Sequence, residues 1–387
     1  MSGWHEVQLK EIVSFVVDNR GKTPPTCADG YELLEVNVIS QAKRNPDYTK
    51  TRKFVSEDIY VSWFRNGHPV IGDILVPTVG TIGNVAFVNE SRGTIAQNLI
   101  ALRFKPGVDC LYVYYYLSSP YSKELMISLD IGGVQPSIKV PHLLDMQIKL
   151  PLLNEQKAIA SVLSNLDDKI DLLNRQNKTL EAMAETLFRQ WFVEEAGEDC
   201  SITELVDFNP TRKLKKGTIA PYLGMTSLST TTFAPDGWYD REFTSGTKFV
   251  NGDTLLARIT PCLENGKTAY ITFLKENQVC WGSTEFIVMH PRSGLHPFFG
   301  YVLARNQVFR EYAEGCMAGS SGRQRVDVEH LKKFDISSPS EELISQFNKI
   351  ADVIAPKLHN NMMQIKTLEK LRDSLLPKLM SGEVRVE

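Results

Sequence analysis

Two short segments carry the glycine, lysine and threonine that a phosphate-binding loop needs. They are Gly21-Lys22-Thr23 and Gly266-Lys267-Thr268. Such a loop needs a further glycine five residues before the glycine of the Gly-Lys pair, so that its backbone amides can surround the phosphates. Val16 and Pro261 occupy those two positions. Both segments are therefore interpreted as turns.

Other catalytic patterns are also incomplete. A metal-dependent nuclease of the Pro-Asp and Glu-x-Lys type needs both parts, but neither Pro46-Asp47 nor Pro235-Asp236 is placed to join Glu155-Gln156-Lys157. An amino-methyltransferase would carry an Asn/Asp-Pro-Pro-aromatic run, which Asn209-Pro210-Thr211-Arg212 does not match. The six cysteines are scattered without a Cys-x-x-Cys pair, which is typical of reduced thiols. We predict no catalytic site, metal or cofactor in this chain.

What remains is a set of hydrogen-bond donors in loops that glycine or proline flanks. Arg, Lys, Gln and Ser side chains can bind DNA phosphates or base edges, although a basic cluster is also typical of a solvated face. Two of these loops are glycine-rich and stand at equivalent places in the two halves of the chain, where they could equally be connectors. The candidate DNA contacts are Arg20, Lys22, Lys43, Arg44, Gln135 and Ser137 in the first half, and Lys213, Lys215, Lys216, Arg323, Gln324 and Arg325 in the second. Because Arg323 and Arg325 alternate around Gln324, an extended loop would point both guanidinium groups the same way.

The sequence contains an internal repeat. Residues 140–192 match residues 328–380 without a gap at an offset of 188 positions. The run Lys178-Thr179-Leu180-Glu181, for example, falls on Lys366-Thr367-Leu368-Glu369. The parts before these segments match only weakly. This pattern predicts two copies of one unit, each a globular segment followed by a long helix, with a shared frame that carries two different globular segments.

Each long helical segment carries apolar residues at spacings that alternate between four and three, which is the seam of a coiled coil. Two antiparallel helices related by a pseudo-two-fold axis are the simplest arrangement, with the polar Asn177 fixing their register; the alternative is that each helix packs on its own globular segment. Pro356 and Pro377 predict a kink and a frayed end in the second helix. The expected seam residues are Ile159, Leu163, Leu166, Ile170, Leu173, Asn177, Leu180 and Leu187, and then Ile354, Leu358, Asn361, Ile365, Leu368 and Leu375.

The composition is that of an ordinary globular protein. The net charge is −3, with 42% hydrophobic and 23% charged residues. No apolar run approaches the roughly 18–20 residues that span a bilayer, and the first residues contain no secretory signal. We therefore expect a cytoplasmic protein with no membrane partner.

Two runs at the centre of the chain are Leu150-Pro151-Leu152-Leu153-Asn154-Glu155-Gln156-Lys157 and Leu187-Phe188-Arg189-Gln190-Trp191-Phe192. They resemble the central conserved region of Type I restriction–modification specificity subunits. The C-terminal run from Leu368 to Val384 resembles that family's second conserved region, and Ser283-Thr284-Glu285-Phe286-Ile287-Val288 resembles a recurrent strand of its target recognition domains. The second helix departs from the family pattern at Pro339-Ser340-Glu341-Glu342-Leu343.

The resemblance implies an α+β fold, with two similar mixed α/β target recognition domains joined by two long antiparallel coiled-coil helices. The implied boundaries are residues 1–150 and 196–338 for the recognition domains, and 151–195 and 339–387 for the helices. The resemblance implies a DNA-binding, non-catalytic subunit in which each domain recognises one half of a split, asymmetric target in double-stranded DNA, while the helices set the spacer.

The partners that the resemblance implies are two methyltransferase (modification) subunits and restriction/translocase subunits. S-adenosylmethionine, ATP and Mg would be bound by those partners and not by this chain. The alternative is a coiled-coil scaffold whose end domains bind proteins or glycans.

Overall fold

The computed structural model describes residues 4–21, 23–40, 43–194, 198–320 and 322–386. The chain forms two compact units. Unit 1 contains residues 1–170 and 367–387, and unit 2 contains residues 171–366. Each long helix contributes one segment to each unit. Among the described residues, no helix is both long enough and apolar enough to cross a membrane.

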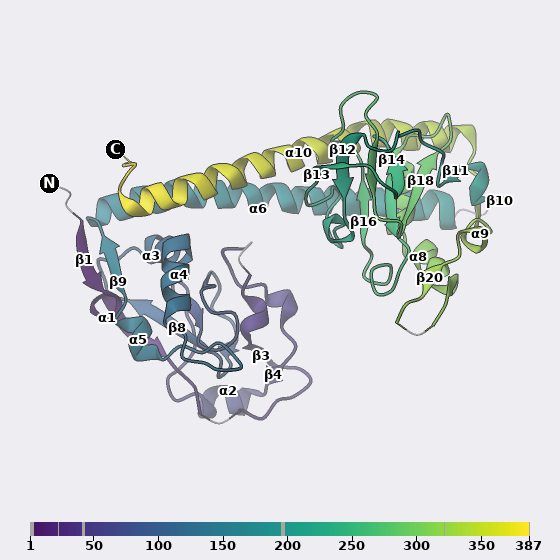
Figure 1. The fold of residues 1–387 in the computed structure, drawn as a ribbon. Helices are drawn as coiled ribbons and strands as arrows, with labels where there is room; N and C mark the ends of the chain where they lie inside the picture. Colours follow the sequence, from purple (N-terminus) through teal and green to yellow (C-terminus); the bar gives the residue numbers. More distant parts are fainter. Residues whose placement is uncertain (1–3, 22, 41–42, 195–197, 321, 387) are drawn as a thin grey trace. The chain divides into compact units, whose positions relative to one another are not determined.

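Unit 1 is built around an antiparallel sheet in the order β2-β8-β5-β6, of which β8 is labelled in Figure 1. Its strands are β2 (Val13–Val17), β8 (Leu99–Phe104), β5 (Ile74–Pro77) and β6 (Ala86–Phe87). A smaller sheet and a strand pair complete the β structure: β4 (Phe54–Val55), β3 (Tyr31–Leu34) and β7 (Thr94–Ile95), then β1 (His5–Gln8) with β9 (Gln147–Leu150). The short helices are α1 (Leu9–Ile12), α2 (Glu57–Trp63), α3 (Cys110–Ser118), α4 (Pro120–Ser128) and α5 (Val140–Leu144).

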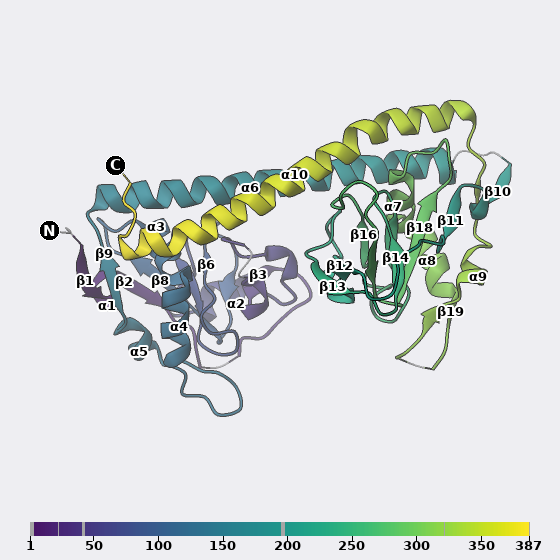
Figure 2. The same cartoon turned by 45° about the horizontal axis from the view of Figure 1, so that its top comes forward.

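Unit 2 repeats this plan with its own antiparallel sheet in the order β11-β18-β15-β16. The strands are β11 (Val206–Phe208), β18 (Phe286–Pro291), β15 (Thr254–Ala257) and β16 (Thr268–Tyr270). A second sheet contains β13 (Tyr239–Glu242), β12 (Ile219–Leu223), β17 (Cys280–Gly282) and β14 (Thr247–Phe249). Two further pairs of strands are formed by β10 (Asp199–Ser201) with β21 (Asp335–Ser337) and by β19 (Met317–Ala318) with β20 (Arg325–Val326). The short helices are α7 (Phe298–Arg305), α8 (Gln307–Gly315) and α9 (Val328–Leu331), with α7 beside the first sheet (Figure 2).

A buried aspartate immediately precedes the equivalent inner strands β5 of unit 1 and β15 of unit 2, each called here the central strand of its sheet. Asp73 and Asp253 are 1% and 0% exposed, and each accepts a backbone N–H from three residues upstream, at 2.9 and 2.8 Å. A buried carboxylate needs cationic or hydrogen-bonding partners, and the two units supply different ones. The guanidinium of Arg103 donates to Asp73 through two nitrogens, at 2.9 and 3.0 Å. Asp253 instead forms hydrogen bonds with Arg212 at 3.0 Å and with His290 at 2.7 Å. The repeat therefore keeps the backbone frame while its side chains diverge.

The long helices α6 (Leu153–Arg189) and α10 (Glu341–Ser381) lie side by side (Figures 1 and 2). In unit 2, Asn361 Nδ2 donates to Asn177 Oδ1 at 2.7 Å, and the rings of Phe192 and Phe347 are 5.6 Å apart. In unit 1, Leu379 and Met380 share a core with Ile159 and Leu163. As α6 advances, its partners in α10 fall in sequence number, so the helix segments are antiparallel in each unit. Helix α10 passes through Pro356 and continues beyond Pro377.

The buried stripe of α6 departs from the expected seam after Asn177. Before that point Ile159, Leu163, Ile170 and Leu173 are buried, whereas Leu166 is half-buried. After it, Glu181, Ala184 and Phe188 are buried, as is Phe192 in the π-helical turn Gln190–Glu194 that follows α6. The expected Leu180 and Leu187 are only half-buried. On α10 the buried members are Ile354, Leu358 and Asn361, whereas Ile365, Leu368 and Leu375 are half-buried.

Two physical causes account for this shift. A straight helix drifts relative to a strict heptad, because 3.6 residues per turn do not match a period of 3.5. In addition, Phe188 and Phe192 pack on Phe299 of α7, with ring centroids 5.1 and 5.2 Å away. The C-terminal part of α6 thus packs both on its partner helix and on the globular body of unit 2, which is the globular segment of the other half of the repeat.

Polar contacts from the globular bodies reach the helices at buried acids. In unit 1, the Tyr115 hydroxyl donates to Asp167 at 2.6 Å, and Arg372 of α10 binds the other oxygen of Asp167 at 2.9 Å. In unit 2, the Tyr301 hydroxyl donates to Glu181 at 2.7 Å. Burial raises the pKa of Glu181 to about 7, although the Tyr301 hydrogen bond and the charge of Arg305 oppose that rise.

Glu181→Gln should therefore change how the stability of the protein depends on pH. Because the folded-state pKa lies above the unfolded value of about 4.3, the contribution of Glu181 is most favourable below that value and declines as the pH rises to about 7. The amide removes this decline and can still accept from Tyr301. We expect a gain in the free energy of unfolding on the order of 1–3 kcal/mol at pH 8 that disappears near pH 4.5.

The measurement is urea unfolding of the purified protein between pH 4.5 and 8. The control is Glu194→Gln, which changes an exposed carboxylate paired with Arg189 and should leave the pH profile unchanged. A difference between Glu181→Gln and the wild type that does not vary with pH would contradict this account.

Candidate nucleic-acid interface

Two loops, residues 130–137 in unit 1 and the described residues 318–320 and 322–325 in unit 2, are held by the same backbone contacts. In unit 1, Ile138 N donates to Thr78 O, and Gly80 N donates to Pro136 O, both at 2.9 Å. In unit 2, Val326 N donates to Arg258 O at 2.9 Å, and Thr260 N donates to Gln324 O at 3.1 Å. Isolated bridges also match, Val79 with Ser137 and Ile259 with Arg325. Each loop therefore docks on the turn that follows the central strand of its sheet.

The loop of unit 1 closes around one carboxylate. Asp130 Oδ1 accepts the backbone N–H groups of Gly132 and Ser137, each at 2.8 Å, and these bonds lower the pKa of Asp130. The candidate Ser137 thus supplies backbone to the frame, whereas the side chain of Gln135 is exposed. Val134 at the tip is fully exposed.

In the loop of unit 2, Arg323 and Arg325 have different environments, although the sequence predicted that an extended loop would point both the same way. Arg325 lies in β20 and makes a bidentate ion pair with Glu285, with Nε and Nη2 both 2.8–3.0 Å from its carboxylate. Arg323 is exposed, and no side-chain hydrogen bond ties it to another residue of the part that the structure describes. The backbone carbonyl of Gln324 accepts two hydrogen bonds from Thr260, one from its N–H and one from its hydroxyl. These bonds hold the backbone between Arg323 and Arg325. The geometry leaves Arg323 available to a ligand.

The other candidates that the structure describes in unit 1 form ion pairs with neighbouring carboxylates. Arg20 binds Asp18, Lys43 pairs with Asp47 at 2.9 Å, and Arg44 binds Asp168 of α6 at 2.6 Å. The side chain of Arg44 is only 14% exposed, so it acts as a link between the globular body and the helix. Lys22 lies outside the described residues.

In unit 2, Lys213, Lys215 and Lys216 are all exposed in the segment before β12. The backbone of Gly217 and Thr218 pairs with Phe243, which brings this segment beside β13. All four residues of β13 are exposed, and the guanidinium of Arg241 lies over Tyr222, 4.9 Å from the ring centroid. Arg241 is a donor that the sequence analysis missed; the signal was three consecutive charged residues, Asp240 to Glu242, which are unusual in a covered strand.

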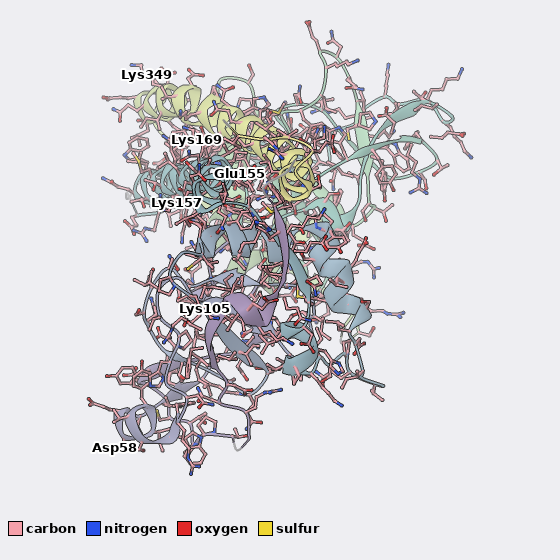
Figure 3. The ribbon with its side chains drawn as sticks, turned by 90° about the vertical axis from the view of Figure 1, so that its left-hand side faces the viewer. Asp58, Lys105, Glu155, Lys157, Lys169 and Lys349 are labelled. Atoms are coloured by element: carbon pink, nitrogen blue, oxygen red, sulfur yellow. The ribbon has the colours of Figure 1, made fainter. Side chains whose placement is uncertain are left out.

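The Glu-x-Lys run lies on the first turns of α6, where Figure 3 labels Glu155 and Lys157. Gln156 between them is buried, and its amide binds Asp109 N at 2.9 Å and Pro151 O at 2.8 Å. The run therefore anchors the start of the helix. Within the described ranges, no group of three or more His, Cys, Asp or Glu side chains is placed to hold a metal ion.

Comparison with known proteins gives one consistent result. Residues 1–182 match the model of the Type I restriction modification DNA specificity domain. The MjaIX specificity subunit of a Type I restriction enzyme from Methanocaldococcus jannaschii is 26% identical over 82% of this chain and 78% of its own length. The HindI specificity subunit from Haemophilus influenzae is 20% identical over 81% of this chain and 86% of its own length.

The crystal structure of the S subunit from M. genitalium has the same fold. It is 17% identical in sequence, with a TM-score of 0.56, and the match covers 98% of this chain and 96% of that one. Over most of its length, this chain is similar to Type I restriction–modification specificity subunits. The resemblance to this family and the α+β fold with two long helices, which the sequence predicted, are confirmed.

Proposed function

We propose that this protein is the non-catalytic DNA-recognition subunit of a Type I restriction–modification complex, in which each globular segment recognises one half of a split target. The observation that carries the proposal is the pair of equivalent loops with different side chains. Equivalent backbone positions that carry Gln135 in one unit and Arg323 in the other are suited to two similar domains that recognise different DNA sequences. The proposed segments are residues 1–150 and 196–338 for recognition, with 151–195 and 339–387 as the helices between them.

The chemistry of the complex is assigned to partners. A methyltransferase subunit would bind S-adenosylmethionine, and a restriction/translocase subunit would bind ATP and Mg, all in the cytoplasm. These partners would also supply part of the attraction to DNA phosphates, because this chain has a net charge of −3. A scaffold that binds proteins or glycans is the alternative, and it requires no salt-dependent affinity for DNA when the partner subunits are present.

A shallow apolar groove on α6 is the surface that we assign to a methyltransferase subunit. Its lining is Lys178, Thr179, Ala182, Met183, Thr186 and Leu187. Met183 is 52% exposed, and Leu371, at the equivalent position in the repeat, is 44% exposed. Two equivalent apolar positions, one on each long helix, suit two copies of the same partner.

If the helices act as a ruler, a longer pair should lengthen the spacer and leave the half-sites unchanged. One heptad inserted after Leu173 and one after Asn361 keep the apolar periodicity. Seven residues add about 10 Å of helix, which corresponds to about three base pairs at 3.4 Å each. The measurement is methylation mapping with the assembled complex, and recovery of altered half-sites with the original spacer would contradict the ruler.

The docking surface predicts a change in stoichiometry. Met183→Glu and Leu371→Glu each place a charge on one of the two equivalent positions, so each variant should retain one methyltransferase subunit, and the double variant should retain none. Val353→Glu is the control, because Val353 is 68% exposed on α10 but does not line the groove. Native mass spectrometry of the assembled complex measures the count. Two bound subunits in the double variant would rule out this surface.

A further inference from the structure

Counting from the shared backbone contacts makes the two loops equivalent residue by residue. Ile138 and Val326 occupy the same place in the frame, as do Pro136 and Gln324, because each pair makes the same backbone hydrogen bond to the turn after the central strand. One position further back, Gln135 of unit 1 corresponds to Arg323 of unit 2. Both side chains are exposed, and neither has a side-chain hydrogen bond to another described residue.

The neighbouring polar side chains are either paired, as in Arg325, or less exposed, as in Ser137 and Gln324. Arg325 is bound to Glu285 through a bidentate pair. Its counterpart Ser137 is only partly exposed, and its backbone N–H is held by Asp130. On each loop, one polar side chain next to the shared frame therefore remains available to a ligand.

Both loops present that side chain from a constrained backbone. In unit 1, Asp130 binds both ends of the loop, and a Cβ on Gly132 would collide with the carbonyl oxygen of Gln135. In unit 2, β19 pairs with β20, Arg323 N donates to Ser320 O at 3.0 Å, and Gly322 adopts a φ of 77° that favours glycine. A side chain on a fixed backbone loses less conformational entropy when it binds. This is the property that selective recognition needs.

The two side chains differ in the base that each can bind through two hydrogen bonds. A glutamine amide offers one donor and one acceptor, which match N6 and N7 of adenine in the major groove, whereas the guanidinium of arginine offers two donors, which match O6 and N7 of guanine. We infer that Gln135 and Arg323 are equivalent specificity-determining residues, with Gln135 selecting an adenine in one half-site and Arg323 a guanine in the other. This inference rests on the proposed function.

Exchanging the two side chains tests the inference. In Arg323→Gln, the preference for G·C at one position of the second half-site should fall by about 5- to 150-fold, the factor that corresponds to one bidentate contact. That position should favour A·T or become relaxed, and the first half-site should stay the same. In Gln135→Arg, one A·T position of the first half-site should change toward G·C, and the second half-site should stay the same. The readout is methylation of a randomised-site plasmid library by the assembled complex.

Matched controls separate selective contact from a change of charge. Arg325→Gln makes the same chemical change two residues away, in a side chain that Glu285 holds, and should leave the motif unchanged. Val134→Arg adds the same charge as Gln135→Arg one residue away, and should also leave the preferred base unchanged.

The failures of the inference and of the proposed function are distinguishable. If the wild-type complex methylates a split motif but both exchange variants keep it, the inference is wrong and the proposed function stands. A motif shift in the controls that equals the shift in the exchange variants also contradicts the inference. If the wild-type complex shows neither DNA methylation nor salt-dependent DNA affinity, the proposed function itself fails.

Discussion

The pairing of α6 with α10 depends on polar contacts set into an apolar seam. Asn361 is fully buried and donates to both Asn177 and Gln176, at 2.7 and 2.9 Å. A polar pair of this kind lowers stability relative to apolar packing. It also fixes the helix register, because a shift of one helix along the other would leave the buried amides without hydrogen bonds. Tyr115 with Asp167 and Tyr301 with Glu181 then tie the globular bodies to the same helices. In each unit, the placement of the globular body on the two helices thus depends on the helix register.

The repeat divides into parts that are shared and parts that are free to vary. The backbone bonds that receive each loop are the same in both units, as is the buried aspartate at the start of the central strand. The cation beside that aspartate, and the side chains at the loop tips, are different. Such a division allows the side chains at the loop tips to change at little structural cost, because the backbone frame that holds them makes few demands on those side chains.

Much of the architecture follows from the sequence, because the repeat and the apolar periodicity are visible in it. On α6 the buried positions coincide with the expected ones up to Asn177, apart from the half-buried Leu166, and then shift. The aromatic packing of Phe188 and Phe192 on α7, which accompanies the shift, is a tertiary contact without a sequence signal. The candidate contacts were less predictable. A list of basic residues does not say that Arg44 is covered by α6, that Arg325 is paired with Glu285, or that Arg241 lies exposed on an edge strand, because each depends on which segments fold beside one another.

The central claim is that the two globular segments are separate readers on one frame. The most direct test is methylation sequencing of DNA from cells that express the complex, after residues 201–338 have been replaced by the equivalent segment of a relative with a different target. The account predicts that one half of the methylated motif changes while the other half and the spacer stay the same. A change in both halves would contradict it.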